Sequence, residues 1–144
     1  MKCPACHREL TERHVGQLRV DVCAGGCGGV WFDTFEPGRI AEETESAGEG
    51  LAYIPKDRRL RVDLSKPRHC PRCVAAILKH LPFAPGSRAS VDECPDCGGC
   101  WMEDGELAQL EFERSQRQGG EDGNKSDSGL IAYLYEVRTG RRKV

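Results

Sequence analysis

The chain has 144 residues, a mass of 15.9 kDa and a formal net charge of −2. Leu, Ile, Val and Phe supply only 28 residues, about 19% of the chain and under the roughly 20% typical of a chain that builds a sizeable core. Seventeen glycines and eight prolines favour short elements, and nine cysteines suggest small units held together by something other than burial. This composition excludes one large apolar domain, and no apolar run is long enough to cross a membrane.

The first predicted unit covers residues 1–47 and contains two cysteine pairs. The pairs are separated by 16 residues: Cys3 and Cys6, then Cys23 and Cys27. Alternating apolar and polar residues over 18–22 predict a half-buried strand that ends at the second pair. Gly28 and Gly29 follow the last cysteine, where a metal knuckle needs a residue at positive φ and N–H groups aimed at sulfur. The unit therefore offers four thiolates to one metal ion, and Gly25-Gly26 can absorb the extra residue between the second pair.

Residues 48–65 are predicted to link this unit to a second one. Leu60, Val62 and Leu64 alternate with polar residues in the linker. This period of two predicts an added strand there.

A basic strip spans the end of the linker and the start of the second unit. Residues 56–79 hold eight cations but only two acids, Asp57 and Asp63. Such a local excess is the footprint of a nucleic-acid contact, in which guanidinium groups grip phosphates. The alternative is a solvated linker whose charges balance the acidic run within 33–49 and the anionic metal sites. The candidate contact residues are Lys56, Arg58, Arg59, Arg61, Lys66, Arg68 and Arg72, with Lys79 beyond them.

The second unit, residues 66–116, repeats the first. Its cysteine pairs are separated by 20 residues: Cys70 and Cys73, then Cys94 and Cys97. Both units contain the motif Val-Asp-x-Cys at the start of the last cysteine pair and the motif Gly-Gly-x-Trp after that pair. Trp31 and Trp101 are therefore equivalent. We interpret both tryptophans as the apolar body that covers a metal site, with base stacking as the alternative. Asp104 is the predicted N-cap of a short helix with Leu107 and Leu110 on one face.

The spacing of the eight paired cysteines predicts two structural zinc ions, one in each unit. Because no apolar stretch follows the basic start of the chain, we expect no secretory signal and a cytoplasmic location, where disulfides are rare. A disulfide framework, iron in a four-thiolate site and thiol-disulfide catalysis remain alternatives, although the last would require a βαβ pattern that is not seen. Four protein ligands leave no open position, which disfavours catalytic zinc.

Three further residues near the ligands are interpreted as non-ligands. Cys100, the ninth cysteine, is expected to be a small buried hydrophobe beside Trp101, with a redox or substitute-ligand role as the alternative. His7 and His69 adjoin ligand cysteines, but eight thiolates already fill two sites. We therefore expect both histidines to be solvated.

The C-terminal part of the chain changes in character. Residues 117–129 have no aliphatic or aromatic side chain and are predicted to be disordered. Residues 130–144 combine apolar side chains at helical spacing with a basic end, which predicts an amphipathic C-terminal helix. Such a segment cannot bury itself alone, so it is expected to dock onto the protein or a partner. Its apolar residues are Leu130, Ile131, Leu134 and Val137.

The repeated cysteine, Gly-Gly and Trp motif, followed in the second unit by Gly105-Glu106-Leu107, resembles the bacterial zinc-ribbon family named after the general transcription factor TFIIB. The resemblance covers both units and implies a small, metal-stabilised, mostly β fold. It implies two tandem zinc ribbons with a short helix after each knuckle, zinc binding, and a link to nucleic acid or transcription. The first unit departs from the pattern, because Pro37 shortens or displaces its helix and its second cysteine pair is wider.

Together these observations predict a non-enzymatic zinc-binding protein that contacts nucleic acid or transcription-related assemblies through the basic strip. One alternative is a protein–protein adaptor in which the acidic faces and residues 130–137 engage a partner. A thiol redox or metal-handling protein that uses Cys100 is the third hypothesis. No membrane and no small-molecule substrate is expected.

Overall fold

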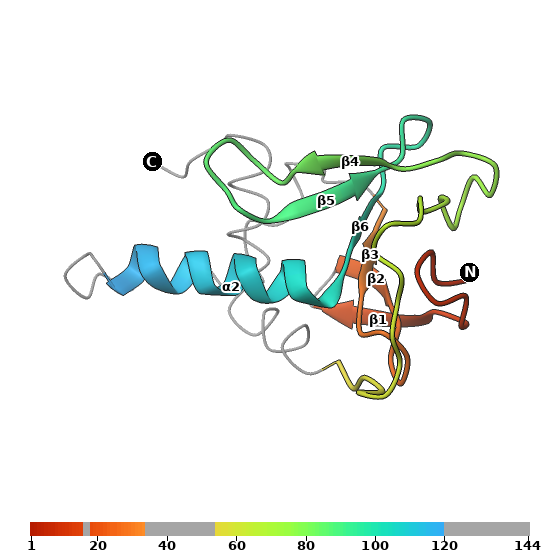
Figure 1. Cartoon of the computed structure of the whole chain (residues 1–144), viewed down its shortest axis with the longest axis horizontal. Helices are drawn as coiled ribbons and strands as arrows, with labels where there is room; N and C mark the ends of the chain where they lie inside the picture. Colours follow the sequence, from red (N-terminus) through yellow and green to blue (C-terminus); the bar gives the residue numbers. More distant parts are fainter. Residues whose placement is uncertain (16–17, 34–53, 120–144) are drawn as a thin grey trace.

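The computed structural model describes residues 1–15, 18–33 and 54–119, and its strands form one six-stranded antiparallel sheet (Figure 1). The first unit supplies three strands and the second unit three, in the order β1-β2-β3-β6-β5-β4. Helix α2 follows the last strand. The elements are β1 (Thr11–Val15), β2 (Leu18–Val22), β3 (Val30–Phe32), β4 (Lys79–Pro82), β5 (Ser90–Glu93), β6 (Cys100–Met102) and α2 (Asp104–Gly119).

The two units meet at β3 and β6, which pair at the centre of the sheet. Trp31 lies opposite Trp101, and Val30 lies opposite Met102. Each unit then places its remaining strands outward from this pair in the same order. The sheet therefore has an approximate two-fold relationship about the two tryptophans, and both units share one layer.

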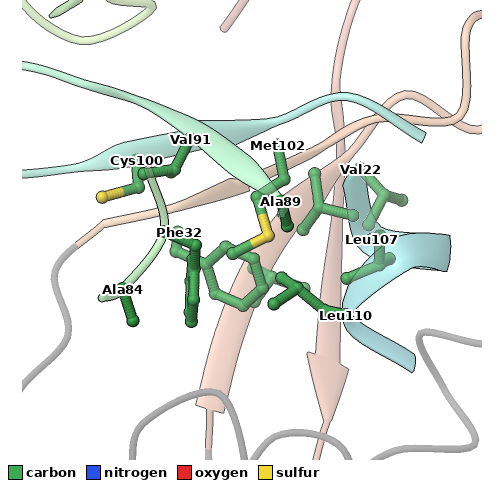
Figure 2. Close-up of a cluster of buried hydrophobic side chains, with 12 residues drawn as sticks. Val22, Phe32, Ala84, Ala89, Val91, Cys100, Met102, Leu107 and Leu110 are labelled. Atoms are coloured by element: carbon green, nitrogen blue, oxygen red, sulfur yellow. The ribbon is translucent and has the colours of Figure 1, made fainter. Parts of the chain in front are cut away.

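One face of the sheet carries the apolar core. Because side chains alternate along a strand, one set from each of β2, β3, β5 and β6 belongs to this core. Figure 2 shows Phe32, Met102 and Leu110 converging on the middle of this cluster. The helix thus covers strands of both units. The buried members are Val20, Val22, Val30, Phe32, Phe83, Ala84, Ala89, Val91, Cys100, Met102, Leu107 and Leu110.

The opposite face carries the tryptophans and the cysteines. Trp31 and Trp101 share a row across the sheet with Asp21 and Asp92, their partners on β2 and β5. Both tryptophans are buried in a cluster with cysteines of the two predicted metal sites. The metal ligands therefore lie on the side of the sheet away from α2.

Helix α2 begins one residue earlier than the sequence predicts and is longer. The carbonyl of Glu103 accepts hydrogen bonds from the N–H groups of Glu106 and Leu107 at 3.0 and 3.2 Å. Glu103 is therefore the N-cap, and the N-cap predicted at Asp104 is wrong, because that residue already lies in the first turn. The helix continues to the glycine pair after residue 118, since nothing before it breaks the pattern.

The strand predicted from residues 60–64 does not form. Two aspartates instead close local turns, because their side chains accept backbone N–H groups: Asp57 from Arg59 at 3.0 Å and Asp63 from Ser65 at 2.9 Å. These turns satisfy the backbone without a strand partner. The linker consequently forms turns, and its start is bound to Gly25 and Gly26 of the first unit.

Three further predictions lie outside the described residues. They concern the displaced helix near Pro37, residues 120–129 of the segment predicted to be disordered, and the amphipathic segment 130–144. The first three residues of the predicted disordered segment, 117–119, belong to α2, so the prediction is wrong for them, because the helix continues through polar residues.

Candidate metal centres

Two clusters of four cysteine sulfurs lie on the tryptophan side of the sheet. In each cluster all four Sγ atoms lie within 4.8 Å of one another, and the members are the two sets predicted from spacing. The Sγ–Sγ separations between the two pairs are 3.6 Å for Cys3–Cys27, 3.4 Å for Cys6–Cys23, 3.8 Å for Cys70–Cys97 and 3.9 Å for Cys73–Cys94.

The sulfur spacing fits tetrahedral zinc. With Zn–S bonds of about 2.3 Å, the sulfurs of a tetrahedral site lie about 3.8 Å apart. The separations in both clusters lie close to this value. All four donors are thiols, the soft ligands typical of closed structural zinc sites. Each cluster therefore fits one zinc ion whose coordination the protein alone completes.

Backbone N–H groups point at the first sulfur of each cysteine pair. These bonds favour the thiolate and fix the turn around it. The pattern is the same in both units, although the second pair of the first unit is wider. The donors are Ala5 and Cys6 for Cys3, Cys27 for Cys23, Arg72 and Cys73 for Cys70, and Asp96 and Cys97 for Cys94, at 3.2–3.5 Å.

The residue after each pair adopts positive φ. Gly28 and Gly98 have φ values of 81° and 77°, as their positions after the last ligand predict. His7 and Val74, which follow the first pair of each unit, have φ values of 65° and 59°. Positive φ is unusual for these residues, above all for β-branched valine, and no glycine marks the positions in the sequence. Sequence reasoning therefore missed two of the four turns.

Gly25 and Gly26 absorb the extra residue of the first unit, as predicted. Gly25 adopts a φ of 79°, and its N–H group donates to the carbonyl of Pro55 at 2.7 Å. A Cβ atom at Gly26 would lie 2.4 Å from the Cys23 Sγ atom. The two glycines thus allow the longer turn while the sulfurs keep their positions.

The electrostatics of the clusters call for a cation. In the first cluster a hydrogen bond donated by the Cys27 thiol, together with backbone N–H groups, lowers the pKa of Cys3 to about 5 although burial opposes the shift. Burial raises the pKa of Cys23 to about 11 and the pKa of Cys70 to about 12. Four adjacent thiolates repel one another, and a divalent ion supplies the charge that lets all of them ionise.

Both tryptophans belong to the core, as predicted. Their side chains are fully buried beside the cysteines, which rules out stacking on exposed bases. Each indole N–H donates to a carboxylate two residues ahead, Trp31 to Asp33 at 3.0 Å and Trp101 to Glu103. The tryptophans thus cover the metal sites and hold two acidic side chains.

The residues interpreted as non-ligands occupy the expected environments. Cys100 is only 1% exposed within the core that faces α2. His7 and His69 are exposed, and neither belongs to a four-sulfur cluster. The metal centres therefore use eight of the nine cysteines.

Arg68 lies in the interior. Its side chain is 6% exposed, and its guanidinium donates to Glu103 at 3.0 Å and to the carbonyls of Asp63 and Lys66 at 2.9 and 3.0 Å. Burial acts to lower the pKa of Arg68, but the bond to Glu103 outweighs it and the pKa is raised. A phosphate cannot reach a guanidinium held in this way, so Arg68 is not part of the exposed strip.

The other cationic side chains of the basic strip fall into two groups, those with an acidic partner and those without one. The side chains of Arg58, Arg61 and Lys66 are exposed and make no hydrogen bond or ion pair among the described residues, although the Lys66 backbone bonds to Arg68 and Asp63. Arg59 is 94% exposed in spite of its neighbour. The paired cations are Lys56 with Asp104 at 2.6 Å, Arg59 with Asp57 at 3.5 Å and Arg72 with Asp33 at 2.7 Å.

Comparison with known proteins agrees with this geometry. Within residues 1–15, 18–33 and 54–119, no helix combines the length and apolar character of a membrane span. No curated protein and no solved structure matches the chain. The TFIIB-type zinc-ribbon family model, described as transcription factor zinc-finger, matches residues 2–43 and 69–111, more than half of the sequence. Each match contains one four-cysteine cluster, and the chain therefore belongs to the transcription factor zinc-finger family as two tandem zinc ribbons.

Proposed function

We propose that the protein is a non-enzymatic binding module with structural zinc, which contacts the phosphate backbone of nucleic acid in a transcription-associated role. The observation that carries this proposal is the basic loop, residues 57–66, whose four cations are exposed. Clustered Lys and Arg side chains provide the sequence-independent part of nucleic-acid binding. The four cations are Arg58, Arg59, Arg61 and Lys66.

Hydrogen bonds fasten both ends of the basic loop to the ribbons. At its start the N–H group of Asp57 donates to the Gly26 carbonyl at 2.8 Å. At its end the buried Arg68 reaches back to the carbonyls of Asp63 and Lys66. An anchored loop has less backbone entropy to lose on binding, which supports its use as a contact surface.

The closed coordination of both metal centres supports the non-enzymatic part of the proposal. Each cluster supplies four protein ligands, so neither ion has an open position for water or substrate. The ions hold the turns that carry the sheet. The description of the matched family supports the link to transcription.

The two other hypotheses rest on other parts of the chain. Cys100 packs in the core, which supports a structural role in place of redox or metal transfer. The adaptor hypothesis depends on residues 130–137, which lie outside the described residues, and it stays a prediction.

Salt-dependent binding tests the proposal. The zinc-loaded full chain is titrated onto fluorescent oligo-dT and onto a labelled duplex at a series of salt concentrations. The two ions with eight thiolates bring the formal charge of the protein to about −6, so we expect binding only at low salt. Replacing all four loop cations by Ala should reduce the slope of log affinity against log salt by about 0.7 to 0.9 for each lost contact.

A matched variant controls for net charge. Lys2→Ala combined with Arg88→Ala removes two exposed cations outside the loop and is compared with Arg59→Ala combined with Arg61→Ala, which removes two exposed cations inside it. The first pair should leave the slope unchanged, and the second should reduce it. If the wild-type protein binds neither nucleic acid at low salt, or if both variants weaken binding equally, the proposed function is wrong.

A further inference from the structure

The second cysteine pair of the first ribbon encloses a turn that is one residue longer than its counterpart in the second ribbon. Three residues separate Cys23 from Cys27, whereas two separate Cys94 from Cys97. Both turns nevertheless bring their sulfurs into a four-cysteine cluster. Zinc coordination therefore does not require the extra residue. We call the longer turn, residues 23–27, the long knuckle.

The long knuckle is the place where the linker bonds to the first ribbon. The Gly25 N–H group donates to the Pro55 carbonyl at 2.7 Å, and the Asp57 N–H group donates to the Gly26 carbonyl at 2.8 Å. Gly26 and Lys56 also form a parallel β-bridge. Figure 1 shows the start of the linker, in yellow, beside the orange loop of the first ribbon. The extra residue thus gives the knuckle backbone groups that bond to the linker.

Two further contacts hold the same part of the linker. The guanidinium of Arg8 donates to the Gly25 carbonyl at 3.0 Å and lies 3.9 Å from the Asp57 carboxylate. A Cβ atom at Gly28 would lie 3.2 Å from the Lys56 Cβ atom, so the backbone after the last ligand packs closely against the linker. The first ribbon therefore holds residues 55–57, where the basic loop begins, by both backbone and side-chain contacts.

The second ribbon holds residues 55–57 only weakly. Its equivalent turn, residues 95–96, makes no hydrogen bond to another segment in the part of the chain that the structure describes. An ion pair joins Lys56 to Asp104 at 2.6 Å, but both side chains are exposed, and an exposed pair adds little stability. The buried Arg68 holds the other end of the basic loop. The hydrogen bonds to the long knuckle are therefore the main restraint on residues 55–57.

The long knuckle in turn depends on its zinc ion. Gly25 has a φ of 79°, and two adjacent glycines give the turn more backbone freedom than other residues would. Its internal hydrogen bonds end on Cys23, whose carbonyl accepts from Gly26 and Gly28 at 3.2 and 3.1 Å. Without the ion the two cysteine pairs lose the bonds that join them, and the turn is free to open.

The first site also holds its ion with fewer supporting bonds. Of the described backbone N–H groups, three donate to sulfurs of the first site, whereas four donate to sulfurs of the second site. Such bonds stabilise the thiolate ligands. We therefore expect the first site to release its zinc before the second site does.

We propose that zinc in the first site controls the order of the basic loop through the long knuckle. While the ion is bound, the knuckle holds residues 55–57 and with them the start of the loop. When the ion leaves, the start of the loop is released, while Arg68 keeps its end in place and the second site keeps its zinc. The consequence for nucleic acid rests on the proposed function, because an unanchored loop has more entropy to lose on binding.

Deletion of Gly25 separates the linker contact from zinc binding. The knuckle then has the spacing of Cys94 and Cys97 and should keep its zinc, but it loses the N–H group that bonds to Pro55. Amide hydrogen exchange of the zinc-loaded full chain, read by mass spectrometry, measures the protection of residues 55–62. We expect exchange in this segment to become about tenfold faster, because two backbone hydrogen bonds no longer hold it. Native mass spectrometry should still find two zinc ions per chain.

A matched insertion controls for knuckle length. A glycine placed between Pro95 and Asp96 gives the turn of the second ribbon the length of the long knuckle and should leave the exchange of residues 55–62 unchanged. Arg8→Met keeps every cysteine and should speed this exchange by about threefold, and it decides the question if the deletion variant loses a zinc ion. Equal effects of the deletion and the insertion, or no effect of the deletion and of Arg8→Met, would overturn the proposal.

Stepwise removal of zinc tests the dependence on the metal. A chelator is added to the full chain in increments, and native mass spectra are paired with hydrogen exchange. The species with one zinc ion should lose protection at residues 55–62 and keep it at residues 66–103. Unchanged exchange of residues 55–62 in this species, or earlier loss of protection at residues 66–103, would contradict the proposal.

The two proposals fail separately. At low salt the deletion variant should bind oligo-dT about threefold more weakly than the wild type, and the insertion variant should bind it equally well. If hydrogen exchange responds as described but the wild-type protein does not bind oligo-dT, only the proposed function is wrong. If oligo-dT binds but the deletion leaves the exchange of residues 55–62 unchanged, only the role of the long knuckle is wrong.

Discussion

Ribbon 1 (the first unit) and ribbon 2 (the second unit) contribute equivalent residues to the seam between them, the β3–β6 pair. Each tryptophan ring covers a glycine of the other ribbon: a Cβ atom at Gly29 would lie 2.3 Å from the Trp101 ring, and one at Gly99 would lie 2.2 Å from the Trp31 ring. Reciprocal contacts of this kind are typical of two-fold interfaces. The repeated Gly-Gly-x-Trp run therefore serves the seam as well as the metal knuckles.

At the outer strands the ribbons differ. Asp21 and Asp92 hold equivalent positions, but Asp92 faces His80, whereas Asp21 faces Glu12. One carboxylate oxygen of Asp21 is buried without a hydrogen-bond partner among the described residues. Burial and then the charge of Asp33 raise the pKa of Asp21. The Asp21 carboxylate of ribbon 1 is thus less well hydrogen-bonded than the equivalent Asp92 carboxylate of ribbon 2.

Helix α2 follows ribbon 2 and covers the core that the two ribbons share. The linker contacts both ribbons, ribbon 1 at Gly25 and Gly26 and ribbon 2 through Arg68. At the tip of the first knuckle, ribbon 2 exposes Val74 by 73% where ribbon 1 has His7. The two ribbons therefore have equivalent metal sites and equivalent residues at the seam. They differ at the surface, where a partner would make contact.

Loss of a zinc ion should have the largest effect on the stability of the protein. The effect should be greater for the site of ribbon 2 than for the site of ribbon 1. Structural zinc contributes on the order of 10 kcal/mol to folding in small domains. Cys94→Ser should empty the site of ribbon 2 and unfold both ribbons, because strands of ribbon 1 depend on α2 for their core. Cys23→Ser should leave ribbon 2 partly folded with one zinc. Zinc content and amide NMR spectra of both variants measure the difference.

A Cys94→Ser variant that keeps one zinc ion and a folded ribbon 1, to the same extent that Cys23→Ser keeps a folded ribbon 2, would contradict this coupling. The ribbons would then be independent in spite of the shared sheet.

Removal of Arg68 should have the next largest effect. Its guanidinium is buried against Glu103, which is itself only 15% exposed and also accepts from Trp101. Arg68→Met leaves this carboxylate without its cation and should lower the free energy of unfolding by about 3 kcal/mol. Chemical denaturation of the zinc-loaded protein measures this. A loss no larger than that of Arg88→Met, at an exposed site, would show that the pair is not structural.

A methyl group at the seam should destabilise both ribbons similarly. Gly29→Ala and Gly99→Ala each force a Cβ atom into the tryptophan ring of the other ribbon, and we expect a loss of about 2 kcal/mol for each. Gly105→Ala is the control, because a Cβ atom there meets nothing within 4 Å. Thermal unfolding at saturating zinc compares the three. A marked difference between the two seam variants would argue against the two-fold arrangement.

The metal ligands could be predicted from the sequence because their chemistry is local. Two turns with fixed cysteine spacing define a tetrahedral site whatever surrounds them, and the alternation over 18–22 specifies β2 in the same local way. The seam is different in kind. Trp31 and Trp101 meet through strand pairing between distant segments, and no local period encodes that register.

The failed predictions have a similar origin. Alternation over 60–64 predicted a strand, but the Asp57 and Asp63 turns satisfy the backbone locally and this segment pairs with no strand. Arg68 looked like its neighbours in the basic run, yet Glu103, distant in sequence, draws it into the interior. Charge patterns locate cations along the chain, whereas their partners depend on the fold.

The smallest of the expected effects concerns the ion pair that crosses the seam, Arg72 with Asp33. Both side chains are partly exposed, so we expect a double-mutant cycle with Arg72→Ala and Asp33→Asn to give a coupling of about 1 kcal/mol at neutral pH. Burial alone would raise the pKa of Asp33, but hydrogen bonds from Arg72 and Trp31 outweigh it and the pKa is lowered.

A carboxyl whose pKa is lowered by folding stabilises the protein at all pH values above its unfolded pKa, and this contribution is lost only as the pH falls through the folded pKa. The coupling should therefore stay constant from neutral pH down to about pH 5.5, where zinc can still be kept saturating. A coupling that fades within this window would mean that the pKa of Asp33 is raised well above its ordinary value by folding, and hence that Arg72 does not hold the two ribbons together through it.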